Sequence, residues 1–221
     1  AAENILSKGK LVDFINTPVV VFPAFYPLFL SSIQFLTGLK ILSFAPYANA
    51  LLFAIVIILS GYIIEQFSNA SRLYKIALLS CIVLSPALLE VYSLLLSETV
   101  FILLLVLFMI ALNSYFKNYS RKSLLTAAII ASLAAITRYA GITIFIAGGI
   151  CLVLNMKLPK RQKIKDILLF TFICPSLLII NLIRNNIVSN TNTGIREKSL
   201  VSLHNNMHDA GAVFNDWLPF R

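Results

Sequence analysis

Two charged residues at the borders of apolar segments are the first candidates for chemistry. Glu98 directly precedes one apolar run, and Arg138 separates two others. Charged groups are costly at such borders, so they predict function unless a structural role explains them. The structural role for Glu98 is that of an acid at a helix N-terminus, with Ser97 as the cap. The structural role for Arg138 is that of an arginine whose head group extends to the membrane interface.

A carboxylate beside an arginine suits a substrate that carries a phosphate. The guanidinium offers a fixed bidentate fork to phosphate oxygens, and a carboxylate can orient a hydroxyl or act as a base. We therefore expect Glu98 and Arg138 to face one common cavity, with roughly 10 Å or less between their charged groups. Glu90 ends another apolar run at the same level, and its simpler interpretation is a solvated acid in a loop.

A second candidate lies near the end of the sequence. His204 and His208 are four residues apart, and Asp209 follows directly. On a helix this spacing could bind a metal ion. The surrounding sequence is polar and fixes no third ligand, so we expect a loop and assign no metal.

The composition places these residues in a membrane protein. Of the 221 residues, 59% are hydrophobic and 12% are charged, with a mean hydropathy of +0.88. Soluble domains are about 45–50% apolar and about 25% charged, so soluble globular and disordered classes are excluded. The 18 basic and 9 acidic residues give a net charge of +9, which in such a chain reflects membrane orientation rather than nucleic-acid binding. Three cysteines in apolar runs are expected to be buried and unpaired.

We expect an all-α fold, a polytopic transmembrane bundle of about six membrane segments. A spanning helix needs about 20 apolar residues. The apolar stretch 123–156 would extend about 51 Å as one helix, which exceeds a hydrocarbon core of about 30 Å. It is therefore divided into two at Arg138. The expected segments are 48–66, 73–90, 98–116, 123–137, 141–156 and 164–185.

The distribution of charge also favours a hairpin in this stretch. Basic clusters occur at 117–122 and 157–165, on either side of it. A hairpin places both clusters in the cytoplasm, as the positive-inside rule requires. The inner loops then hold ten basic and two acidic residues, and the outer parts hold eight basic and seven acidic. Residues 1–47 and 186–221 are expected outside.

The first external loop is expected to be amphipathic. A short helix ended by Gly9 begins it. Its apolar segment 19–39 is interrupted by Pro23 and Pro27, and we expect it to lie in the outer interface rather than to span. The opening Ala-Ala-Glu has neither Met nor a signal peptide, so we expect sequence upstream. The external loop 186–221 is expected to lead into a further C-terminal part.

Four motifs, in this order, resemble those of one enzyme family. Residues 2–10 resemble "A-x-N-L-x-x-G-x-G", and residues 22–30 resemble "P-P-L-Y-P-L-L-L". Residues 97–101 resemble "S/T-E/D-P-x-F", and residues 137–141 resemble "T-R/K-x-x-G". Together they are similar to GT-C type membrane glycosyltransferases. The relevant branch holds bacterial lipid-carrier-dependent enzymes related to protein O-mannosyltransferases and aminoarabinose–lipid A transferases.

The resemblance implies a multi-pass protein of the bacterial inner membrane that uses a polyprenyl-phosphate sugar donor. The sugar would pass to a lipid, glycan or protein acceptor at the outer face, without a nucleic-acid partner. Glu98 would be the catalytic acidic residue in this chain, and Arg138 would contact the donor phosphate. Tyr139, Tyr26 and Glu90 would also bind substrate. The family's main catalytic Asp would lie upstream. Relatives differ in their use of metal, so the cofactor stays unknown and a divalent metal is not assigned.

Two other function classes fit parts of this pattern. A polytopic transporter or lipid flippase subunit would show inverted repeats and polar groups near the membrane midplane. The sequence has no apparent repeat and its ionisable residues lie at the outer edge, which favours the enzyme. A non-catalytic membrane scaffold would tolerate the loss of both Arg138 and Glu98.

Overall fold

The computed structural model describes residues 1–194 and 207–208 of the chain. Apart from one isolated bridge between Val12 and Pro18, the elements in this part are helices, which confirms the all-α prediction. In chain order they are α1 (Ala2–Lys8), α2 (Phe25–Thr37), α3 (Ile41–Phe67), α4 (Arg72–Val83), α5 (Pro86–Ser93), α6 (Glu98–Asn118), α7 (Arg121–Thr137), η1 (Tyr139–Gly141), α8 (Ile142–Leu154), α9 (Lys160–Ile173) and α10 (Ser176–Ser189).

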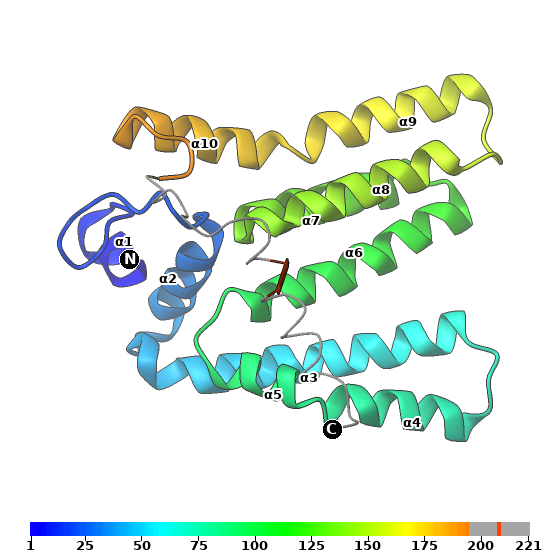
Figure 1. Ribbon diagram of the computed structural model, residues 1–221, viewed down its shortest axis with the longest axis horizontal. Coiled ribbons are helices and arrows are strands. Elements are labelled where there is room, and N and C mark those ends of the chain that lie inside the picture. The colour runs from blue at the N-terminus through cyan, green and yellow to red at the C-terminus, as the bar shows by residue number, and fades with distance from the viewer. Residues whose placement is uncertain (195–206, 209–221) are drawn as a thin grey trace.

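The long helices lie side by side, and α7 occupies the centre (Figure 1). It packs against α6, α8, α9, α10 and α2. Its buried positions are mostly small, which lets five neighbours approach one helix closely. The fully buried alanines are Ala127, Ala128, Ala131 and Ala134.

Three helical segments are long and apolar enough to cross a membrane: α3, α6 and the region Lys160–Ser189. The pair α4 and α5, bent by 44°, can count as a fourth. Large apolar side chains cover the outside of the bundle, such as Ile58 at 69% and Phe172 at 83% exposure. These features indicate a multi-pass integral membrane protein. Helices α7 and α8 have 17 and 13 residues, about 25 and 20 Å, so the expected total of six segments stays a prediction.

Several helix boundaries differ from the expected segments. Helix α3 begins at Ile41 rather than at 48, because Pro46 lies in its second turn and removes only one hydrogen bond. The expected segment 73–90 is broken after Val83, where Pro86 starts α5. The last segment is interrupted at Pro175, between α9 and α10. The first loop is thus shorter than expected, and helix α10 continues to Ser189.

The stretch 123–156 does fold back on itself at Arg138. Helices α7 and α8 pack against each other, and η1 joins them. Figure 1 shows the α3–α4, α6–α7 and α8–α9 connections at one end of the bundle. The basic clusters 117–122 and 157–165 therefore share one end. The assignment of that end to the cytoplasm stays a prediction.

The first loop gathers at the opposite end, where α2 runs across the bundle (Figure 1). Helix α1 ends at Gly9, whose φ of 64° lies in the left-handed region, as predicted. Helix α2 is one continuous helix of 13 residues, because Pro27 falls in its first turn, where the missing N–H removes no bond. At about 20 Å it is not among the candidate spans.

The three cysteines are unpaired, but only one is buried. Cys174 lies in the core, whereas Cys81 and Cys151 are exposed on the surface of the bundle. The expectation of burial was wrong for these two. They sit in apolar helices whose outer surface suits lipid, so hydropathy alone could not tell core from lipid contact.

Candidate functional site

Glu98 and Arg138 form an ion pair at the end of the bundle that holds the first loop. Glu98 is the first residue of α6, and Arg138 links α7 to η1. The Arg138 Nη1 contacts Glu98 Oε1, which confirms that the two charged groups lie well within 10 Å. The pair joins the start of one candidate span to the turn of the helical hairpin.

The Thr137–Gly141 turn owes its position to tight local packing. The buried Thr137 hydroxyl donates to the Leu133 carbonyl at 2.7 Å, which closes the last turn of α7. A Cβ atom at Gly141 would lie 2.4 Å from the Ala134 carbonyl carbon. Only glycine therefore lets η1 pack directly on the α7 backbone. This contact fixes where the chain leaves α7 and so where Arg138 points.

Arg138 keeps donor groups for a further partner. Its side chain is 36% exposed. Within the described part of the chain, its Nε and Nη2 make no hydrogen bond beyond the ion pair. A guanidinium presents five N–H donors in a planar fork. Two of its nitrogen atoms can therefore bind oxygens of an anion while Nη1 stays with Glu98.

Glu98 is oriented by a neighbour as well as by the arginine. The Ser97 hydroxyl donates to Glu98 Oε2 at 3.3 Å, and the Glu98 side chain is 33% exposed. Ser97 occupies the N-cap position of α6, but its side chain makes no capping hydrogen bond. The expected role of Ser97 as a side-chain cap was therefore wrong, because its hydroxyl serves the carboxylate instead.

Tyr26 on α2 lies near this pair. Burial raises the pKa of Tyr26 to about 12, against a lowering by the Thr99 hydroxyl, and the Glu98 charge adds to the rise. The Tyr26 hydroxyl is buried without a hydrogen bond of normal geometry to any described residue. The Thr99 hydroxyl donates instead to the Leu96 carbonyl at 2.9 Å. Tyr26 therefore offers a neutral phenol beside the carboxylate.

The other two predicted residues lie differently. Tyr139 donates its hydroxyl to the Val20 carbonyl at 3.4 Å, so it holds the first loop against η1. Glu90 is exposed on α5, and its carboxylate makes no hydrogen bond or ion pair with the described residues. The structure thus brings Tyr26 to the pair, ties Tyr139 to the loop beside it, and leaves Glu90 apart.

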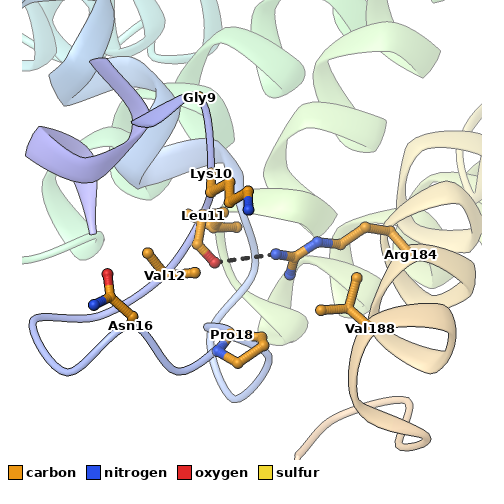
Figure 2. A pocket seen from close by; sticks show the side chains of 8 residues that line it. All are labelled: Gly9, Lys10, Leu11, Val12, Asn16, Pro18, Arg184 and Val188. Carbon is orange, nitrogen blue, oxygen red and sulfur yellow. Dashed lines mark hydrogen bonds between the residues drawn. The ribbon is translucent and has the colours of Figure 1, made fainter. Parts of the chain in front are cut away.

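Two pockets lie between the first loop and α10, with volumes of about 610 and 340 Å³. Neither is lined by Glu98 or Arg138. Arg184 lines both, and donates to the carbonyls of Leu11 at 3.1 Å and Val19 at 2.7 Å. Figure 2 shows its guanidinium extending from α10 towards Leu11.

Sequence reasoning gave Arg184 no role. The available signal was its position inside the expected span 164–185, where a charged residue is costly. The neighbouring Asn185 is buried and donates its amide to the Val20 carbonyl at 3.3 Å. Arg184 and Asn185 together fasten the first loop to α10.

No cluster of three or more His, Cys, Asp or Glu side chains suited to a metal occurs among residues 1–194 and 207–208. His204 and Asp209, from the candidate metal motif, lie outside the described residues. Comparison with protein-family models, curated proteins and solved structures finds no match for this chain. The resemblance to GT-C enzymes stays a prediction from the four motifs.

Proposed function

We propose that the protein is a membrane glycosyltransferase that moves a sugar from a polyprenyl-phosphate donor to an acceptor at the outer face of the membrane. The observation that carries this proposal is the Glu98–Arg138 pair, about one third exposed, in which Arg138 keeps Nε and Nη2 for a phosphate. The two residues lie in two of the four motifs that resemble the family, 97–101 and 137–141. The apolar bundle around it suits a donor with a long lipid chain.

In this proposal Arg138 stabilises the leaving group. The acceptor oxygen bonds to the sugar carbon while the bond between that carbon and the donor phosphate breaks. The phosphate keeps the electron pair, and the acceptor's proton passes to the base. A guanidinium already placed beside that phosphate offsets the growing charge without reorganising. Glu98 fixes the guanidinium and orients the acceptor hydroxyl, while the resemblance implies that the main base lies upstream.

Tyr26 would complete the wall of this site. Its hydroxyl, which keeps its proton at neutral pH, can donate to a sugar or phosphate oxygen. An unpartnered buried hydroxyl costs free energy, and a bound substrate would remove that cost. This buried hydroxyl is therefore stronger support for a polar ligand beside Glu98 than the sequence motif that contains Tyr26.

A lipid flippase or transporter is the alternative. The interruptions of α4–α5 at Ser85 and of α9–α10 at Pro175 favour it, because broken helices are common in transporters. A flippase would move a labelled polyprenyl-phosphate sugar across a vesicle membrane without transferring the sugar. The same vesicles can measure both activities.

The test compares variants of the full-length protein in vesicles that contain a polyprenyl-phosphate sugar. We expect Arg138→Lys to lower kcat/KM at least about tenfold, because it loses one charge-assisted hydrogen bond worth about 1.5–3 kcal/mol. Glu98→Gln should also lower it. The matched control is the ion pair at the other end of the bundle, Lys75 Nζ to Glu65 Oε2 at 2.9 Å; Glu65→Gln and Lys75→Arg should keep full activity.

A charge swap separates the catalytic role from a structural one. The double change of Glu98 to Arg and Arg138 to Glu keeps the ion pair but reverses its polarity. A structural pair would be rescued by the swap, whereas a phosphate-binding pair would not. Near-normal transfer by both single variants, with normal expression, would remove these residues from the mechanism.

A further inference from the structure

The smaller pocket beside α10 has an apolar wall and a polar end. Its volume is about 340 Å³, within the range of small-molecule sites. The apolar side chains come from four helices: Ile5 from α1, Leu28 from α2, Ile136 from α7, and Leu177 and Ile180 from α10. Leu28 and Ile180 are also exposed on the outside of the bundle, so an apolar chain in the pocket could continue into lipid.

A buried amide without a partner lies in this wall. Asn181 lines the pocket and is only 8% exposed, and its side-chain nitrogen makes no hydrogen bond. A buried donor left unsatisfied costs about 1–3 kcal/mol. The apolar neighbours give this amide no partner that would offset the cost. A ligand with an acceptor oxygen would satisfy it.

Arg184 supplies an unneutralised charge on the same face of α10. It lies three residues after Asn181, the spacing of neighbours on one helix face. Within the described residues it forms no ion pair, and its Nε donates to no acceptor. Lys10 lines the adjoining larger pocket, which Arg184 also lines (Figure 2), and its ammonium makes no hydrogen bond or ion pair with the described residues.

We propose that this pocket binds a lipid monophosphate whose phosphate lies beside Arg184, where the larger pocket with Lys10 adjoins it. The phosphate contacts Arg184 and Lys10, accepts a hydrogen bond from Asn181, and leaves its chain among the apolar side chains. Two positive groups match the charge of a phosphate monoester at pH 7, about −1.5 to −2, better than that of a carboxylate. The site goes beyond the proposed function, because it is formed by residues other than Glu98 and Arg138.

Binding can be measured without any sugar transfer. The probe is radiolabelled dodecyl phosphate, added to the full-length protein in phosphatidylcholine nanodiscs, with empty nanodiscs subtracted. We expect Asn181→Leu to weaken binding about tenfold through the lost hydrogen bond. Lys10→Gln should weaken it about fivefold through the lost charge. Lys40→Gln is the control, because Lys40 is exposed and lines neither pocket.

Folding and ligand source are controlled in the same experiment. Asn181→Leu should unfold at the same temperature as the parent protein or higher, because it removes an unsatisfied amide. Dodecanol and inorganic phosphate should each compete poorly. Equal affinity of Asn181→Leu, Lys10→Gln and the parent protein would overturn the site. Competition by inorganic phosphate alone at the same concentration as dodecyl phosphate would overturn the lipid assignment in favour of free phosphate.

Discussion

Replacement of Gly141 by alanine should separate the turn that carries Arg138 from the helix that supports it. The added Cβ would lie 2.4 Å from both the carbonyl carbon and the carbonyl oxygen of Ala134, and 2.5 Å from the Ala135 nitrogen. These are backbone atoms of α7, so no side-chain rotation relieves the contact. An ordinary van der Waals contact is 3.4–4 Å long. To reach it, η1 must move away from α7 by about 1 Å or more.

The cost can be bounded from general packing energies. An extra methyl group forced into a packed core costs typically about 1–3 kcal/mol. Gly149 provides the matched control, because a Cβ there meets nothing within 4 Å. At that position in α8 alanine should stabilise the helix by up to about 1 kcal/mol. The two variants should therefore differ by about 1–4 kcal/mol in free energy of unfolding.

Both changes can be measured by unfolding in mixed micelles with increasing denaturing detergent. Gly141→Ala should unfold at a lower detergent fraction than the parent protein, and Gly149→Ala at the same or a higher one. Movement of η1 should also separate Arg138 from Glu98, so Gly141→Ala should lose activity with Arg138 still present. Equal stability of the two glycine variants would refute the close contact between η1 and α7.

Three further results are expected. Gly148→Ala should destabilise by about 1–3 kcal/mol, because its Cβ would lie 2.7 and 2.8 Å from two phenylalanine rings; unchanged unfolding would contradict this packing. Tyr115→Phe should cost about 1–3 kcal/mol in the same unfolding assay, because it removes the buried 2.8 Å hydrogen bond to Asp166. Cysteines placed at Ser120 and Gln162 should be labelled from the cytoplasmic side only, and labelling of just one of them from outside would disprove the shared orientation.

Much of the helical framework could be predicted from the sequence. The length of the apolar stretch 123–156, with Arg138 and Gly141 in its middle, indicated a helical hairpin, and α7 and α8 form one. Gly9 marked the end of α1. These features depend on the hydropathy and length of single segments and on single glycines, which can be read from the local sequence.

The breaks in helices and the long-range contacts were harder to predict. Pro175 and Pro86 lie inside apolar runs that look continuous in the sequence. Whether the helix breaks at such a proline depends on how the neighbouring helices pack against it. The proximity of Glu98 to Arg138 could be predicted because both lie at the same end of their apolar segments. The hydrogen bond from Arg184 to Leu11 could not be predicted in this way. That contact joins residues 173 positions apart, and no local pattern contains it.

The anchoring of the first loop also determines when it can finish folding. Val19 and Val20 receive hydrogen bonds from Arg184 and Asn185 across 165 positions of sequence. Ribosomes add about 5–20 residues per second, so the loop leaves the ribosome roughly 10–30 s before α10 is made. During that interval these carbonyl groups lack their native donors. Although the segment lies near the start of the described chain, these two contacts can form only after α10 has been made.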